Sequence, residues 1–218
     1  MKLSKRLQAV AEMVTDGSSI ADIGTDHAFL PIELVRSGRI SFALAMDINK
    51  SPLERAIEHI SQYGLSDIIK CRLSNGMNKL DKDEVDCAVI AGMGGDLISE
   101  IISSDHDKVK EVIVSPHTHP ETVRRTLRKY NYKIVSEDFV IDSEKYYPII
   151  KAVKTHSNDI SETECPEYDY FGKLLIQDRN SNLKQYLSGE YEKYYLIPQK
   201  TDYLQLVASA LKEMNRDD

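Results

Sequence analysis

Two aspartates and a glycine lie close together in the segment ADIGTDHA, which covers residues 21–28. The segment follows an apolar run typical of a buried strand, and residues 28–37 after it have helical spacing. A glycine at a strand-to-helix turn lets backbone amides and the helix N-terminus approach a ligand. Asp22 and Asp26 add two carboxylates, so the turn suits a positively charged ligand better than a phosphate. A plain structural turn is the alternative for this short motif taken alone.

A third acid, Asp47, ends the apolar run 42–47 and follows Gly24 by 23 residues. An acid at the end of the second strand can accept hydrogen bonds from a ribose diol. Both NAD and S-adenosylmethionine carry such a ribose, and a solvated aspartate is the alternative. GTDHA lacks the later glycines that cradle a dinucleotide pyrophosphate, whereas S-adenosylmethionine is cationic and has no phosphate. The acidic turn therefore favours S-adenosylmethionine.

Two further loops, SNG (74–76) and AGMGGDLI (91–98), follow predicted strands. Asn75 could line an adenine ring, although Asn-Gly is also a common turn. Three glycines in four residues beside Met93 make a loop that a substrate can approach closely. Enzymes that methylate exocyclic amines often carry an acid or amide followed by two prolines at this position. That motif is absent, which favours a ring nitrogen as the acceptor.

The elements that position these loops alternate between strands and helices. The predicted strands are 18–24, 42–47, 68–73, 85–92 and 111–116, and the predicted helices are 28–37, 51–64, 94–103 and 120–130. This alternation predicts a parallel, doubly wound α/β sheet. Ser51 is predicted to cap its helix, with Glu54 completing a capping box. Residues 132–153 form two β runs around a polar turn, so an antiparallel hairpin is predicted to end the sheet.

The pattern changes after Val153, which predicts a sheet domain at 1–154 and a small helical domain at 155–218. Residues 154–167 are a polar linker, and 168–196 and 201–214 have helical spacing. The apolar stripes are Phe171, Leu174, Leu175, Leu183, Tyr186 and Leu187, followed by Leu204, Val207, Ala208 and Leu211. A helical hairpin this short buries little core of its own, so we expect it to pack on the sheet domain or on a partner.

The net charge of −7, from 28 basic and 35 acidic residues, argues against a nucleic-acid binder driven by bulk charge. Two local basic clusters remain. They are Arg124, Arg125, Arg128, Lys129 and Lys133 in one segment, and Lys2, Lys5 and Arg6 at the N-terminus. Contacts to RNA phosphates are one interpretation, and a solvated helix face is the other.

Three widely spaced cysteines, Cys71, Cys87 and Cys165, predict a reduced, cytoplasmic protein without structural zinc. His117 and His119 have no evident third ligand, so no metal site is expected. No apolar run approaches the ~18 residues of a membrane span. We therefore expect no membrane partner, and a monomer or weak oligomer.

Several motifs together resemble the bacterial tRNA (adenine-22-N1)-methyltransferase family. They are LSKRL (3–7), ADIGTDHA, the spaced Asp47, SNG, AGMGGDLI, KYYPII (145–150) and FGKLL (171–175). The resemblance implies a Rossmann-like class I methyltransferase domain, a coiled-coil-like helical domain, S-adenosylmethionine as donor and tRNA as substrate. The chain departs from the family at SPH (115–117), commonly QPN, and at YYPI (146–149), commonly YEI.

The resemblance implies methyl transfer to N1 of an adenine. Adenine N1 already holds an in-plane lone pair, so its placement matters more than a strong base. Asp26 is the candidate to stabilise the cationic ring or accept an N6 proton, with His27 beside it as an orienting or stacking group. The residues expected to bind the donor are Arg6, Asp22, Gly24, Thr25, Asp47, Ile48, Asn75, Gly76, Ala91, Gly92, Met93 and Gly94.

Three other functions stay open at this point. The protein could methylate a small molecule or another protein, because a modest basic patch on an acidic chain is compatible with that. It could also be a non-catalytic RNA-binding protein that kept the fold and lost turnover. An NAD-dependent dehydrogenase is the weakest rival, because the fingerprint glycines are missing.

Overall fold

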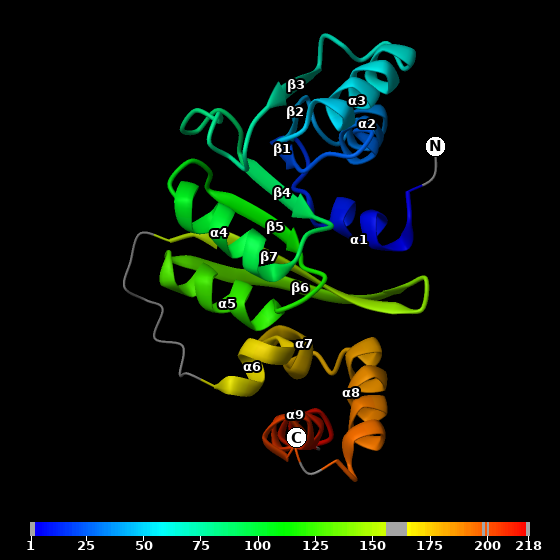
Figure 1. The fold of residues 1–218 in the computed structure, drawn as a ribbon, viewed down its shortest axis with the longest axis vertical. Coiled ribbons are helices and arrows are strands. Elements are labelled where there is room, and N and C mark those ends of the chain that lie inside the picture. The colour runs from blue at the N-terminus through cyan, green and yellow to red at the C-terminus, as the bar shows by residue number, and fades with distance from the viewer. Residues whose placement is uncertain (1–2, 156–164, 198, 200, 217–218) are drawn as a thin grey trace.

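The computed structural model describes residues 3–155, 165–197, 199 and 201–216. A seven-stranded sheet with the order β3-β2-β1-β4-β5-β7-β6 forms its centre (Figure 1). The parallel strands are β1 (Ser19–Ile23), β2 (Phe42–Asp47), β3 (Ile69–Leu73), β4 (Cys87–Ala91) and β5 (Glu111–Ser115). The antiparallel hairpin of β6 (Tyr132–Asp142) and β7 (Lys145–Lys154) ends the sheet beside β5. The predicted doubly wound sheet and its terminal hairpin are confirmed.

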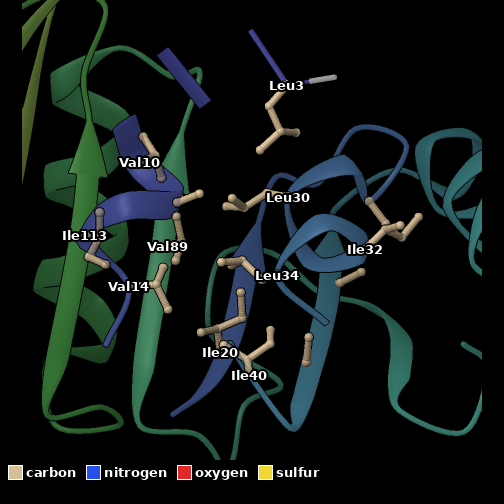
Figure 2. Close-up of a cluster of buried hydrophobic side chains, with 14 of the residues drawn as sticks. Leu3, Val10, Val14, Ile20, Leu30, Ile32, Leu34, Ile40, Val89 and Ile113 are labelled. Carbon is tan, nitrogen blue, oxygen red and sulfur yellow. The ribbon is translucent and has the colours of Figure 1, made fainter. Parts of the chain in front are cut away.

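Helices cover both faces of the sheet. One face carries α1 (Lys5–Met13), α2 (Phe29–Arg36) and α3 (Lys50–Gln62), and the other carries α4 (Gly95–Asp105) and α5 (Pro120–Lys129). Figure 2 shows the first core, where Val10 of α1 and Leu34 of α2 lie against the strands that carry Val89 and Ile20. Because neighbouring strands and both helix layers enclose β1 and β4, their sequences are almost continuously apolar.

The first turn of α3 differs from the sequence prediction. The helix begins at Lys50 with Asn49 as its N-cap residue, so Ser51 is not the cap and no capping box forms with Glu54. Asp47 Oδ1 accepts a hydrogen bond from the Asn49 amide at 2.7 Å, which turns the chain into the helix earlier. Ser51 Oγ instead accepts a hydrogen bond from Arg55 Nη1 at 3.0 Å.

The C-terminal helices are α6 (Pro166–Phe171), α7 (Lys173–Gln177), α8 (Ser181–Tyr194) and α9 (Thr201–Met214). They lie beside α5 and β6, at the edge of the sheet away from β3 (Figure 1). The helical spacing predicted over 168–196 corresponds to three helices, α6, α7 and α8, and not to one arm of a simple hairpin. Gly172 interrupts this spacing with φ +91°, and a Cβ there would lie only 2.7 Å from Glu137 Oε1. None of the described helices is both long and apolar enough to cross a membrane.

The helices share a core with the hairpin, as expected for a segment too short to enclose its own. Phe139 and Tyr146 of the hairpin pack with Leu183 and Leu187 of α8. On α9 the predicted stripe is only partly right. Its buried residues are Val207, Ala210 and Met214, whereas Ala208 is exposed and Leu204 only half-buried. Of the predicted linker 154–167, residues 156–164 lie outside the described residues.

Candidate functional site

The sheet order reverses between β1 and β4, so the loops that follow these two strands diverge at their carboxyl ends. Doubly wound sheets bind ligands at such a switch point. The loop after β1 carries the predicted turn around Gly24, and the loop after β4 carries Gly92, Met93 and Gly94. Topology alone therefore brings the two most informative sequence motifs to one place.

The turn after β1 depends on a glycine. Gly24 has φ +75°, and a Cβ at this position would overlap Met93 Cε. The amides of Gly24 and Thr25 both donate to the Met46 carbonyl, at 2.8 and 2.9 Å. The side chain of Met93 thus covers the turn closely, which only the missing Cβ of glycine permits.

Asp22 is a buried carboxylate beside a second carboxylate. The Asp22 residue is only 9% exposed. Burial raises its pKa from the usual 3.8 to about 6, the Thr25 side chain opposes that rise, and nearby Asp47 adds to it. No ion pair forms at Asp22 within the described part of the chain. A cationic group bound beside it would restore the stability of the charged form, so the donor set fits the ammonium end of S-adenosylmethionine.

Arg6 on α1 approaches the same region from the hairpin side. Its guanidinium nitrogens lie 3.8 and 3.9 Å from where a Cβ of Gly92 would stand, and its Cζ lies 5.3 Å from the centre of the Tyr147 ring. The Arg6 amide donates to Asp142 Oδ2 at 3.1 Å, which ties α1 to the hairpin tip. Arg6 Nη1 is buried and has no hydrogen-bond partner among the described residues. A carboxylate ligand would satisfy this donor.

Asp47 is the last residue of β2, and it contacts the loop that follows β3. The main-chain carbonyl of Asp47 accepts a hydrogen bond from the Ser74 amide at 2.9 Å, which links the loop after β2 to the loop after β3. Ile48 is 59% exposed and Asn75 is exposed. Gly76 has φ +56°, and a Cβ there would lie 3.0 Å from Ile101 Cγ1 of α4. The apolar side chain of Ile48 and the polar side chain of Asn75 are therefore exposed near Asp47, the residue predicted to bind the ribose.

Asp26 lies on the outer rim, with a side chain that is 69% exposed. Its Oδ1 pairs with Arg55 Nη2 at 3.1 Å and lies 3.2 Å from His27 Nε2. The His27 ring stacks on Phe29 and His59, with ring centres 5.1 and 5.0 Å apart. His27 also has φ +63°, a strained conformation for a residue with a side chain. Both predicted catalytic residues are therefore held by neighbouring side chains. The partner of Asp26 is Arg55, so its carboxylate points toward α3.

His117 and Tyr147 adjoin this region and were not among the predicted site residues. The His117 amide donates to the Met93 carbonyl at 2.9 Å, and its ring packs edge-on against Tyr147 at 5.3 Å. Burial, and then the charges of Arg6 and Lys145, lower the pKa of His117. The signal that could have found both residues is the pair of departures from the family pattern, because one falls on each.

The arginines on the basic helix face predicted to bind phosphate instead form ion pairs with carboxylates of this chain. Arg124 is 2% exposed, and its Nε pairs with Glu137 Oε1 at 2.8 Å. Arg125 and Arg128 both pair with Asp169 of α6, at 2.8 and 2.9 Å. A buried guanidinium cannot reach RNA, so the prediction for Arg124 is wrong, and α5 is the joint to the C-terminal helices.

Three lysines of the two basic clusters form none of these ion pairs with acidic residues. Lys129 and Lys133 are exposed, as is Lys5 of the N-terminal cluster. Lys2 lies outside the described residues. Phosphate contacts through these lysines stay a prediction.

Comparison with known proteins agrees with this geometry. The chain is 37% identical over 155 residues to a tRNA (adenine(22)-N(1))-methyltransferase of Bacillus subtilis, covering 70% of this chain and 65% of that relative, or just under two thirds of its length. The crystal structure of the B. subtilis M1A22 tRNA methyltransferase TrmK has a TM-score of 0.78 at 29% identity, over 98% of this chain and 97% of that one. TrmK of M. capricolum, solved with the natural cofactor product S-adenosyl-homocysteine, has a TM-score of 0.79 at 30% identity, over 98% and 96%. A family model described as "Methyltransferase domain" matches residues 3–150, and the chain therefore belongs to that methyltransferase family.

Proposed function

We propose that this protein transfers a methyl group from S-adenosylmethionine to N1 of adenine 22 in tRNA. The observation that carries the proposal is the buried Asp22 carboxylate, which lies near Asp47 at the switch point of the sheet and pairs with no basic side chain among the residues that the structure describes. Similarity to the B. subtilis and M. capricolum enzymes supports the choice of tRNA and of this donor. A tRNA substrate and free cysteines also favour the cytoplasm.

The donor is held by residues from four loops and α1. Asp22 and the turn at Gly24 and Thr25 take its ammonium end, and Arg6 Nη1 takes its carboxylate. Asp47 accepts hydrogen bonds from the ribose hydroxyls, and Ile48, Asn75 and Gly76 border the adenine. Ala91, Gly92, Met93 and Gly94 form the floor on which the target base lies. When bound, S-adenosylmethionine supplies an electrophilic methyl group.

The chain's own contribution to the chemistry is placement and charge. The loop at Met93 aligns the lone pair of adenine N1, which needs no prior loss of a proton. The target ring becomes cationic on methylation, and the Asp26 carboxylate stabilises that charge or accepts a proton from N6. Arg55 and His27 hold Asp26 in position for this role.

The two parts of the chain have different roles in binding the donor and the tRNA. Residues 1–154 form the domain that binds the donor, and residues 155–218 form a helical domain that helps to bind tRNA. Exposing a base that is stacked in folded tRNA costs a few kcal/mol, so contacts from both parts must supply binding energy.

The direct test incubates unmodified tRNA transcript with isotopically labelled S-adenosylmethionine and analyses the nucleosides. We expect labelled 1-methyladenosine, and loss of the label when adenine 22 is replaced by guanine. Donor binding without any methylation of tRNA would instead support another substrate. Failure to bind the donor by calorimetry would support the non-catalytic RNA-binding alternative.

A further inference from the structure

A cavity of about 290 Å³ lies between the sheet and the C-terminal helices. The loop 116–119, the start of α5, the β6–β7 hairpin and helices α6, α8 and α9 form its walls. This volume is just below the ~300–1,000 Å³ typical of ligand sites, so the cavity suits one small ring system better than a whole cofactor. None of the predicted donor-binding residues lines it.

The cavity adjoins the candidate site through a single loop. His117 lines the cavity, and its amide donates to the carbonyl of Met93 at 2.9 Å. The ring of His117 also contacts Tyr147, which packs beneath Arg6. A group in the cavity would therefore lie next to the target base, with His117 between the two.

Aromatic rings and a few polar groups line the cavity. The ring of Tyr146 lies 5.0 Å from that of Tyr186 and stacks on Phe139 at 5.7 Å. His119 Nδ1 lies 3.2 Å from Glu121 Oε1 at the same wall, so hydrogen-bonding groups are also present. Flat aromatic faces with polar edges are the surroundings that a nucleobase favours, and such stacking contributes about 1–3 kcal/mol per base.

We propose that this interdomain cavity receives a nucleobase of the RNA substrate, from a nucleotide next to the target adenine. The inference rests on the proposed function and names a second contact for the same substrate. The target ring itself must lie at Met93, on the other side of His117, so the base in the cavity is a different one. When the target leaves its stack, its neighbour loses a stacking partner, and Tyr146 and Tyr186 replace that partner.

Paired substitutions at Tyr146 test the cavity. Tyr146→Leu removes the ring and keeps apolar volume, so we expect kcat/KM for tRNA to fall about tenfold. The affinity for S-adenosylmethionine, measured by calorimetry, should stay within twofold of wild type. Tyr146→Phe keeps the ring and should retain wild-type values. The matched control is Tyr63→Leu, at the end of α3 on the sheet, where the tyrosine is 40% exposed and does not line the cavity; it should also leave kcat/KM unchanged.

A cross-linking experiment on the wild-type protein does not depend on how the variants fold. A photoreactive thio-substituted base is placed in tRNA at the target position or on either side of it. After irradiation, mass spectrometry should find the flanking base attached to a peptide that carries Tyr146 or Tyr186. Attachment of the target base there, or of no base, would overturn the proposal.

The two proposals fail in different ways. A wild-type protein that methylates tRNA, together with a Tyr146→Leu variant of equal kcat/KM, would overturn the cavity proposal alone. A wild-type protein that forms no 1-methyladenosine would overturn both.

Discussion

Asp22 shows at the scale of one residue how a binding site differs from a stable core. Its carboxylate is buried beside Asp47, and its pKa is raised to about 6. In the free protein at neutral pH this charge is unfavourable, whereas a bound cation makes it favourable. In the proposed function, the same side chain therefore lowers the stability of the empty protein and contributes to the affinity for the donor.

Asp22→Asn should make the free protein more stable at neutral pH. The folded chain keeps a proton on Asp22 up to about pH 6, whereas the unfolded chain loses it near 3.8. The free energy of unfolding of the wild type therefore falls as pH rises between these values. We expect the variant to exceed wild type by up to about 3 kcal/mol above pH 6, and the two to converge below pH 4. Denaturant titration across this range measures the difference, and parallel curves would contradict the assignment.

Donor binding should release a proton near pH 5–6. The bound ammonium group favours the ionised form of Asp22, so affinity should rise with pH until about 6 and then level off. Calorimetry at pH 5.5 in two buffers with different ionisation enthalpies reports the proton directly. Asp22→Asn should bind the donor at least tenfold more weakly and show no such release.

Asp26 has the opposite environment, because it is exposed and paired with Arg55. If it stabilises the methylated ring, Asp26→Ala should lower kcat by about 10²-fold or more while the Kd of the donor changes less than twofold. Asp16→Ala is a matched control, since Asp16 is also an exposed acid paired with an arginine, Arg39. Wild-type turnover in Asp26→Ala would remove Asp26 from the mechanism.

At the scale of elements, the contact between the β1 turn and the β4 loop organises the site. Gly24 and Met93 belong to different loops, yet a single added carbon on the glycine would overlap the methionine. Helix α1 contributes in a similar way, because its N-terminal turn brings Arg6 over Gly92. Three separate elements thus converge on one small volume.

Gly24→Ala should displace Met93 and weaken donor binding by more than tenfold. Gly17→Ala is the matched control, because Gly17 has a similar φ of +83° but nothing within 4 Å of an added Cβ. Both variants carry the same backbone strain, so both should lose about 1–2 kcal/mol of stability. Only Gly24→Ala should lose donor affinity by calorimetry, and equal affinities in the two variants would show that Met93 does not need this approach.

At the scale of the whole molecule, buried charges join the sheet to the C-terminal helices. The side chains of Arg124 and Glu137 are only 2% and 1% exposed, and Arg124 Nη1 also donates to the Asp169 carbonyl at 2.8 Å. Gly172 lies close against both side chains of this pair, because a Cβ there would be 2.7 Å from Glu137 Oε1 and 2.9 Å from Arg124 Nη2. This joint shapes one wall of the aromatic cavity, because Arg124 lines it.

Arg124→Leu should destabilise the protein by about 3–5 kcal/mol, because it leaves the buried Glu137 carboxylate without its cationic partner and with only the Leu174 amide as a hydrogen-bond donor. Arg125→Leu is a matched control, since its side chain is 51% exposed in its pair with Asp169; it should cost about 1 kcal/mol or less. Thermal unfolding monitored by circular dichroism measures both. Equal melting temperatures would show that the buried pair does not hold the joint.

Much of the sheet could be predicted from sequence because buried parallel strands need continuous apolar runs. The turn at Gly24, the spacing to Asp47 and the final hairpin are likewise local patterns, and the structure contains all three. The start of α3 could not be predicted from its capping motif. There the Asp47 carboxylate, already held at the end of β2, redirects the chain before Ser51.

Only the tertiary structure decided which charged residues face water and which face each other. Arg124 lies in a basic segment, but its partners Glu137 and Asp169 are 13 and 45 residues away. No local pattern encodes such a pairing, because it depends on how the hairpin and α6 pack on α5. The aromatic cavity has the same origin, since Tyr146 and Tyr186 come from separate elements that meet only in the folded chain.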